Sequence, residues 1–466
     1  MENFRLEKDF LGERKLPCNV YYGINTLRAS EHFNVSGKKV NFKLIKALVI
    51  VKKAAALANE KVNLLSSEKS QAIIKACDRI LKGEFKDQFI TDSLQGGAGT
   101  STNMNVNEVI SNIAIEILGG KKGDYSLIHP IHDVNMCQST NDVYPTALRI
   151  AAIKLLRSAA DSFSQLQTAL QVKENDFSHI LKLGRTELMD ALPITVGQEF
   201  GAYARAVARD RWRLYKVEER LREINIGGTA IGTGMNAPQK YIFLITDILQ
   251  DITGLGLSRS DFPVDTTQNM DVFCEVSGLL KAAAVNLIKI SNDLRLLGSG
   301  PKGGFGELLI PAVQAGSSIM PGKVNPVILE MVSQVSMKVI ANDASITFAA
   351  SSGQLELNAF SPLIAESILE SLEILNNAVI SLTKNCINNI EVDVNKCKFN
   401  LDASTALVTA LQYYIGYDKA SEVAKKAINE NRSIKEIVVD EKLLSTDLLD
   451  KILNPFSLTS PGIPGK

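Results

Sequence analysis

Apolar residues recur at spacings of three and four positions over long stretches of this chain that contain few glycines or prolines. This period places apolar side chains on one face of an α-helix. Several of the predicted helices have roughly 25–30 residues, well above the globular average of about 11–12. The predicted helices are Phe42–Leu64, Ser67–Leu81, Val143–Phe177, Glu199–Ile224, Asp271–Leu297, Val327–Ala349 and Phe360–Ile387. Such lengths predict a mainly α fold with a bundle of parallel and antiparallel helices.

One predicted helix differs from the others, because its segment Leu279–Ile290 is apolar around most of its circumference. A helix of this kind needs neighbours on every side. Two interpretations are open: the helix lies at an interface between subunits, or it occupies the core of one subunit. The residue pattern alone does not choose between them.

Three segments rich in Gly, Ser and Thr interrupt the helical pattern: Gln95–Asn105, His129–Thr146 and Gly303–Pro326. Their composition is unfavourable in a helix and suits a backbone that turns or exposes its N–H groups. The tail after about Val392 has shorter periodic segments and more charge. We expect this tail to form a small separate helical domain.

The composition excludes several classes of partner. The chain has 466 residues, 45% of them hydrophobic, and its 51 Lys and Arg residues equal its 51 Asp and Glu residues. A chain without a basic excess has no overall field to hold a nucleic acid or an anionic membrane. An anionic ligand therefore has to be bound by a local site.

The cysteines and the N-terminal segment bear on the compartment. The six cysteines are scattered without a Cys-x-x-Cys pair, and the segment from Met1 is polar with no apolar signal sequence. No stretch approaches the roughly 20 apolar residues of a membrane span. We therefore expect a cytoplasmic protein with reduced thiols. With four histidines and no His-x-x-x-His spacing, no zinc site is expected.

The first two interruptions contain candidate anion-binding groups. Gln95–Asn105 places hydroxyl and amide donors behind three glycines, which suits a carboxylate or a phosphate, although a turn capped by Thr100 explains the composition equally well. Ser139 or Thr140 is suited to the N-cap of the following helix, where free N–H groups form an anion site. Capping alone again accounts for these residues.

The third interruption contains the run Gly316-Ser-Ser-Ile-Met-Pro-Gly-Lys-Val-Asn-Pro326. Its glycines permit sharp bends, and Lys323 and Asn325 can hold a carboxylate by charge and by an amide. A bare loop explains the glycines, proline and serines but not the Lys and Asn among them. We therefore interpret this run as a functional loop.

This run resembles the signature loop of the aspartase/fumarase superfamily, and Gly316–Pro326 is called the signature loop below. The other blocks that resemble the superfamily, in the same order along the chain, are Tyr21-Tyr-Gly23, Gln95–Asn105, Gln138–Asp142, Gly184-Arg-Thr186, Gly232–Asn236 and Gln354–Asn358. The resemblance therefore covers nearly the whole chain. Two runs, Gly97–Thr100 and Asn225–Gly234, are more similar to those of aspartases than to those of fumarases.

The resemblance implies a mainly α, three-domain aspartase/fumarase-like fold with a central long-helix bundle. The implied domains are residues 1–139, mixed and mainly helical; residues 140–392, the helical bundle; and residues 393–466, small and helical. It also implies a homotetramer whose active sites each take residues from three subunits. The implied reaction is the elimination of ammonia from a small dicarboxylate amino acid, L-aspartate, to give fumarate, without a metal or an organic cofactor.

The resemblance also implies roles for individual residues. Ser317 is the expected general base, which removes the proton from the carbon next to the β-carboxylate, and loop N–H groups would stabilise its alkoxide. The donors implied for the negative charge of the resulting enediolate are Thr100, Ser139, Thr140 and Ser318. The residues implied to hold the α-carboxylate are Lys323 and Asn325, and those implied to contact the leaving amino group are Asn141 and Thr186.

One position departs from the superfamily pattern. Glu187 stands where fumarases carry His and aspartases carry His or Gln, and Glu330 occupies the position of a glutamate that faces this residue. If that contact is kept, two carboxylates meet and one of them holds a proton with a raised pKa. Alternatively, Glu187 binds a cation, either the aspartate ammonium or part of a more cationic substrate. The other functions left open are a fumarate hydratase and an ammonia-lyase or amine-lyase for a related amino acid.

Overall fold

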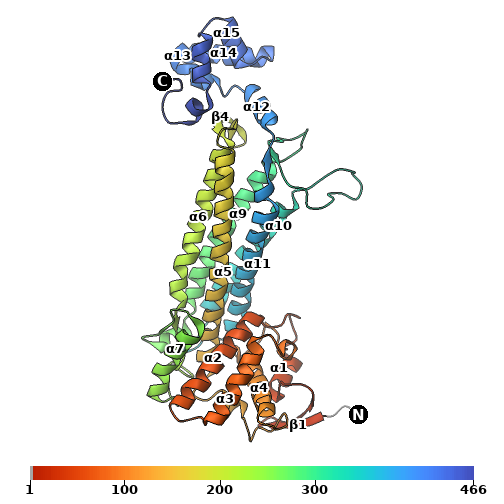
Figure 1. Cartoon of the computed structure of the whole chain (residues 1–466), viewed down its shortest axis with the longest axis vertical. Helices are drawn as coiled ribbons and strands as arrows, with labels where there is room; N and C mark the ends of the chain where they lie inside the picture. The colour runs from red at the N-terminus through yellow and green to blue at the C-terminus, as the bar shows by residue number, and fades with distance from the viewer. Residues whose placement is uncertain (1–3) are drawn as a thin grey trace. The chain divides into compact units, whose positions relative to one another are not determined.

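The computed structural model describes residues 4–466 and is mainly α-helical, as predicted (Figure 1). The first three residues of the polar N-terminal segment lie outside the described residues. Within residues 4–466, no helix is both long enough and apolar enough to cross a membrane. All six cysteines are free.

All seven helices predicted from the apolar period are present. They are α2 (Phe42–Lys61), α3 (Ser67–Leu81), α5 (Thr140–Asp176), α6 (Val196–Leu221), α9 (Asp271–Leu297), α10 (Val327–Ser351) and α11 (Ser361–Asn385). The bounds of α3 and α9 agree with the prediction to the residue, and the other bounds differ by at most three residues. Apolar periodicity therefore located the main helices.

Two segments predicted to interrupt the helices are partly helical. Helix α4 spans Thr100–Ile117 and includes the second half of Gln95–Asn105, while α5 begins inside His129–Thr146. The prediction was wrong for α4 because residues 102–115 are all buried, polar ones included. Packing of this kind overrides the weak helix propensity of Thr and Asn.

The remaining elements are short. The other helices are α1 (Ile24–His32), α7 (Gln239–Thr253), α8 (Pro263–Gln268), α12 (Val394–Asp402), α13 (Val408–Ile415), α14 (Tyr417–Glu430), α15 (Ile434–Asp440), α16 (Thr446–Ile452) and α17 (Pro455–Thr459). The strands are β1 (Phe4–Asp9), β2 (Gly12–Pro17), β3 (Leu181–Thr186), β4 (Met189–Thr195), β5 (Glu223–Ile224), β6 (Ser258–Arg259), β7 (Leu308–Leu309) and β8 (Glu391–Val392). Single turns of 3₁₀-helix span Lys86–Gln88 and Ile387–Asn389, and a π-helical turn spans Pro130–Val134.

Residue contacts gather into two compact units, each built from three parts of the chain. The first unit comprises residues 1–160, 213–282 and 338–374, and the second comprises residues 161–212, 283–337 and 375–466. The division cuts each of the five long helices α5, α6, α9, α10 and α11, so each unit contains a part of every one. The three-domain division expected from the resemblance stays a prediction.

In the first unit, α2 packs against α3 and α7, and α3 packs against α4 (Figure 1). Leu48, Ile73 and Ile110 of α2, α3 and α4 are fully buried. The parts of the long helices in this unit also meet, since Arg157 on α5 pairs with Glu218 on α6 at 2.8 Å. The first unit is thus a continuous helical core.

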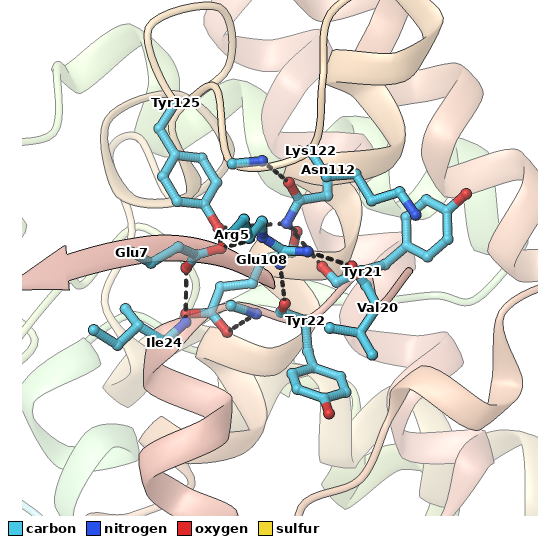
Figure 2. Close-up of polar contacts among 12 residues, drawn as sticks. Arg5, Glu7, Val20, Tyr21, Tyr22, Ile24, Glu108, Asn112, Lys122 and Tyr125 are labelled. Atoms are coloured by element: carbon cyan, nitrogen blue, oxygen red, sulfur yellow. Dashed lines mark hydrogen bonds and ion pairs between the residues drawn. The ribbon is translucent and has the colours of Figure 1, made fainter. Parts of the chain in front are cut away.

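Two buried carboxylates complete the start of α1 in the first unit, where Gly23 offers no capping side chain. Figure 2 shows the carboxylates of Glu7 and Glu108 close to Ile24 at this turn. Glu108 accepts from the Gly23 N–H at 2.8 Å and from the Thr26 hydroxyl at 2.6 Å, and Glu7 accepts from the Ile24 N–H at 2.8 Å. Free N–H groups at the helix start are therefore satisfied by other elements.

In the second unit, β3 and β4 form an antiparallel hairpin, and β7 pairs antiparallel with β8. The short C-terminal helices pack around a hydrophobic cluster that includes Leu411, Val423, Ile437 and Leu449. Leu183 of β3 belongs to the same cluster. The hairpin is thereby attached to the C-terminal helices.

The first unit yields a prediction about acid stability. Burial alone would raise the pKa of Glu370 on α11, but hydrogen bonds from Asn342, Lys38 and Lys338 lower it to about 2, below its ordinary value of 4.5. A carboxyl with a lowered folded pKa stabilises the fold above its unfolded pKa and loses that contribution as pH falls toward the folded value. Glu370→Gln should therefore lower the free energy of unfolding at pH 7 and have little effect near pH 2, measured by urea denaturation.

Glu373→Gln, about one turn further along α11, is the control. Between pH 4.5 and 2, this variant should lose almost as much stability as the parent protein loses. Equal destabilisation by Glu370→Gln at both pH values would contradict the assignment.

Candidate functional site

The start of α5 carries three of the predicted site residues in the first unit. The Ser139 hydroxyl accepts the Asn141 N–H at 3.2 Å, in the manner of a helix cap. The Thr140 hydroxyl accepts from the Asn103 amide at 3.1 Å, and the Asn141 amide donates to the Ala230 carbonyl at 2.7 Å. Ser139, Thr140 and Asn141 are thus held together as one polar turn.

Asp142 connects this turn to the loop Asn225–Gly234. One oxygen of the fully buried carboxylate accepts the Ser139 N–H at 2.9 Å, and the other accepts the N–H groups of Gly227 and Thr229, both at 3.0 Å. Burial raises the pKa of Asp142 to about 7, against the effect of these hydrogen bonds and of Lys52. Asp142 is therefore a clamp between two loops.

Pro145 adds a second link between α5 and the same loop. A proline inside a helix has no N–H to donate to the carbonyl four residues earlier, here that of Asn141. The side-chain amide of Asn225 donates to this carbonyl instead, at 3.0 Å. The proline thus leaves the Asn141 carbonyl available as an acceptor, and Asn225 of the loop Asn225–Gly234 donates to it.

Thr100 begins α4, directly after Gly99, whose φ is +94°. A Cβ on Gly99 would lie 2.4 Å from the ring of Tyr144 on α5, so only glycine allows the two helix starts to approach this closely. The Thr100 hydroxyl donates to the Gly97 carbonyl at 2.7 Å. The first unit therefore brings Thr100 to the same end of α4 and α5 as the polar turn at Ser139.

The signature loop in the second unit is folded around Ser317. The Ser317 oxygen accepts two backbone N–H groups, from Ile319 at 3.2 Å and from Met320 at 2.9 Å. The loop is closed at its base, where the Asn325 amide donates to the Gly316 carbonyl at 2.8 Å. The Ser317 oxygen thus lies where backbone dipoles favour negative charge.

Other predicted residues of the signature loop are exposed. Ser318 and Lys323 lie on the surface, and Gly322 adopts a φ of +80° with open space around it. Gly316 differs, because a Cβ there would lie 2.2 Å from the Lys323 carbonyl. The base of the loop is tight, whereas its tip is exposed.

The β3–β4 hairpin places Thr186 and Glu187 at its tip. Thr186 pairs with Met189, which leaves Glu187 and Leu188 as a two-residue turn with φ values of 54° and 65°. Such turns favour Asn and Gly, and each non-glycine residue with left-handed backbone costs about 1–2 kcal/mol. Glu187 is exposed at a strained position.

Glu187 does not meet Glu330 within one chain. Glu330 lies on the first turn of α10, 3.8 Å from Arg295, and the described residues show no contact between the two glutamates. The contact between Glu187 and Glu330 stays a prediction.

A buried charge cluster anchors the hairpin below its tip. The carboxylate of Glu307 is fully buried and binds Arg185 through two hydrogen bonds of 2.8 and 3.1 Å. Lys182 lies 3.3 Å from the same carboxylate, and the Asn400 amide donates to it at 2.9 Å. Burial acts to raise the pKa of Glu307, but the hydrogen bonds and positive charges of these partners outweigh burial and lower that pKa. Arg185 also stacks on the ring of Phe305, 4.0 Å from its centre.

A cavity of about 250 Å³ borders this cluster, lined in part by Arg185, Glu199, Tyr203 and Lys289. None of the predicted site residues lines it. Within residues 4–466, no group of three or more His, Cys, Asp or Glu side chains is arranged to hold a metal ion.

Sequence reasoning missed the buried residues that hold these loops, namely Lys52, Asp142 and Glu307. For Lys52 a signal was present: it is a charged residue within the apolar stretch Ala47–Leu57, at the helical spacing of residues that are buried. Asp142 lies in the block Gln138–Asp142, but its partners Gly227 and Thr229 are far away in the sequence, as are the partners of Glu307.

A lyase family profile matches residues 12–341, and a fumarase C C-terminus profile matches residues 407–460. The chain belongs to this lyase family, within the aspartase/fumarase superfamily.

Relatives of this lyase match it over nearly its full length. An aspartate ammonia-lyase of Bacillus subtilis is 48% identical, covering 100% of this chain and 98% of the relative, and one of Helicobacter pylori is 46% identical, covering 98% of each. Among solved structures, a fumarate lyase:delta crystallin from Brucella melitensis bound to cobalt is 47% identical with a TM-score of 0.95, covering 98% of this chain and 100% of that one. A class II fumarase from Schistosoma mansoni is 32% identical with a TM-score of 0.93 over the same shares.

The charge cluster of the lyase yields a stability prediction. Glu307→Gln removes the negative charge that pairs with Arg185, while Lys182 keeps its ion pair with Glu199 at 2.8 Å. Removing one partner of a buried ion pair costs about 3–5 kcal/mol. We expect a loss of that size in the free energy of unfolding, measured by urea denaturation.

Glu199→Gln is the matched control, because among residues 4–466 the Glu199 carboxylate binds Lys182 alone, at 2.8 Å, and its second oxygen has no hydrogen-bond partner there. This substitution should cost clearly less than Glu307→Gln. Equal losses for the two variants would show that Glu307 is not the anchor of the hairpin.

Proposed function

We propose that this lyase eliminates ammonia from L-aspartate to give fumarate. The relatives named above support this substrate, since they are aspartate ammonia-lyases that match over nearly the whole chain at 46–48% identity. The observation that carries the chemistry is the pair of backbone N–H groups on the Ser317 oxygen. A serine hydroxyl is a very weak acid, and it can act as a base only where its alkoxide is stabilised.

In the proposed reaction, Ser317 takes the proton from the carbon next to the β-carboxylate. The electron pair of that C–H bond moves into the β-carboxylate, which becomes a dianionic enediolate. Collapse of the enediolate forms the C=C bond of fumarate, and the C–N bond breaks with its electrons on the nitrogen, so ammonia departs. Hydrogen bonds that become stronger as the enediolate forms lower the activation barrier of the reaction.

The polar turn at the start of α5 supports the role of the enediolate donors. The hydroxyls of Thr100, Ser139 and Thr140 lie at the N-terminal ends of α4 and α5, where the helix dipoles favour an anion. Ser318 is the fourth proposed donor and comes from the signature loop. Lys323 and Asn325 are proposed to hold the α-carboxylate.

The signature loop is proposed to close over bound substrate. Lys323 and Ser318 are exposed, and Gly322 has open space around it, so the tip can move while hydrogen bonds at Gly316 hold the base. Closure excludes water and completes the set of catalytic groups.

We further propose that the enzyme works as a cytoplasmic homotetramer, with each active site drawing residues from three subunits. Exposed apolar residues on the long helices support assembly: Val285, Met337 and Phe348 are 53%, 57% and 72% exposed in the single chain. Val285 lies in Leu279–Ile290, so the interface interpretation of that segment is favoured. The free cysteines are those expected in a reducing compartment.

Asn141, Thr186 and Glu187 are proposed to contact the leaving amino group. Glu187 has no ion-pair partner within the described residues, and its exposed carboxylate is free to bind the aspartate ammonium. The hydroxyl of malate offers no such charge, which favours ammonia over water as the leaving group.

The first test follows fumarate by its ultraviolet absorbance with L-aspartate and with L-malate as substrates. We expect turnover of L-aspartate, and a Ser317→Ala variant should lose at least about 100-fold in kcat because the base is absent. The variant should also lose exchange of the carbon-3 proton with D₂O. Ser318→Ala, which removes a donor and not the base, should still catalyse that exchange.

Failure of the parent enzyme with both substrates would overturn the proposed function. Turnover of L-malate alone would identify a fumarate hydratase. Retention of more than a tenth of the kcat by Ser317→Ala would remove Ser317 as the base.

Glu187→Gln tests the recognition of the ammonium. Hydrogen bonds to charged groups contribute about 1.5–3 kcal/mol, so the KM for L-aspartate should rise about tenfold or more. Glu330→Gln is the comparison: an equal effect would support a contact between the two carboxylates instead. Unchanged KM and kcat in Glu187→Gln would contradict any role in substrate binding.

A further inference from the structure

Lys52 is a fully buried lysine in the middle of α2. Its ammonium donates to the side-chain oxygens of Asn135 at 2.7 Å and Gln138 at 3.0 Å. Desolvation makes a buried ammonium costly unless acceptors surround it. Both acceptors belong to the segment that leads into the polar turn at Ser139.

The side chain of Asn135 connects Lys52 to helix α4 and to the backbone of Gln138. Its side-chain oxygen also accepts from the amides of Asn103 and Asn107 on α4, both at 3.2 Å. Its own amide donates to the Gln138 carbonyl at 3.1 Å. Because the ammonium requires an acceptor, Asn135 must direct its oxygen toward Lys52 and its nitrogen toward the Gln138 backbone.

The same network reaches the proposed enediolate donors. The Asn103 amide that binds Asn135 also donates to the Thr140 hydroxyl at 3.1 Å. Gln138, whose oxygen faces Lys52, donates from its nitrogen to the carbonyls of Val134 and Met136. The backbone immediately before Ser139 is therefore shaped by one buried charge.

Two titratable groups face the Lys52 ammonium, Asp142 at the start of α5 and Cys77 on α3. Burial lowers the pKa of Lys52 to about 7, and these two groups act against the shift. Asp142 holds the far side of the polar turn through the Ser139 N–H. Groups whose pKa is shifted this far by burial gather at functional sites.

We propose that Lys52 is a positioning residue, which acts through Asn135, Gln138 and Asn103 to hold Ser139, Thr140 and Asn141 in the geometry that binds substrate. The kinetic part of this proposal rests on the proposed function. Lys52 does not touch the substrate, since it is buried behind the turn. Its effect is on the placement of hydroxyl donors, where a displacement of about 1 Å costs about 100-fold in rate.

The test compares Lys52→Met with Lys53→Met. Methionine is unbranched like lysine and adaptable, so it suits an apolar helix, but it carries no charge and no donor. Lys53 is the next residue on the same helix, and its ammonium pairs with Asp78 on α3 at 2.6 Å, away from the polar turn. Both variants remove one lysine charge from α2, and only one of them changes the network.

We expect Lys52→Met to lower kcat/KM for L-aspartate about 100-fold and to raise the KM. Backbone amides of Ser139 and Asn141, which are hydrogen-bonded in the intact turn, should exchange with D₂O faster in this variant. Lys53→Met should leave the kinetics and the exchange of these amides unchanged. A purely structural role would lower the melting temperature without a selective change at residues 139–141.

The outcomes separate this proposal from the proposed function. If the parent enzyme does not turn over L-aspartate, the amide exchange still tests the positioning role by itself. If the parent is active and Lys52→Met changes neither kcat/KM nor the exchange at Ser139 and Asn141, the positioning role is overturned. Should Lys52→Met not fold, Asn135→Leu removes the shared acceptor at a half-buried position, and unchanged kinetics and exchange there would overturn the proposal equally.

Discussion

The carboxylate of Glu307 is fully buried, and four hydrogen bonds and ion pairs converge on it from Arg185, Lys182 and Asn400. These partners lie on the β3–β4 hairpin and on α12, while Glu307 itself precedes β7 and the signature loop. A single buried charge thus fixes the root of the hairpin, the entry to the signature loop and a C-terminal helix with respect to one another. An uncompensated charge at this place is so unfavourable that the alternative arrangements of these segments are strongly disfavoured.

Asp142 performs the same task in the first unit, where it connects the start of α5 with the Asn225–Gly234 loop. Both carboxylates bind donors of loops or short strands, and Glu307 also binds Asn400 on α12. The long helices bury most of the apolar surface, but their own hydrogen bonds cannot position a loop. The buried carboxylates fix the positions of these loops, because each buried charge must be hydrogen-bonded by specific donors.

The signature loop contrasts with these anchored segments. Its base is held by hydrogen bonds at Gly316 and its serine by two backbone N–H groups, yet no buried charge restrains its tip. This difference fits the proposed mechanism, in which the donors of the polar turn are preorganised and the base arrives with the closing loop. Glu187, at a strained two-residue turn, presents a carboxylate that is held by backbone geometry and not by partners.

The amino-acid sequence by itself determined the long helices, because a sustained period of three and four apolar positions allows only one regular structure. It also determined the superfamily, because the signature loop is a contiguous run whose Lys and Asn have no role in a simple turn. Helix α4 and the roles of Lys52, Asp142 and Glu307 were decided by the tertiary structure alone. Thr102–Asn107 became helical since neighbours bury them, and the anchoring residues act mainly through partners from 83 to 125 positions away. The local sequence pattern does not reveal pairs of residues that are this far apart in the chain. Burial nevertheless makes these pairs energetically important, because polar interactions are strong in a buried environment.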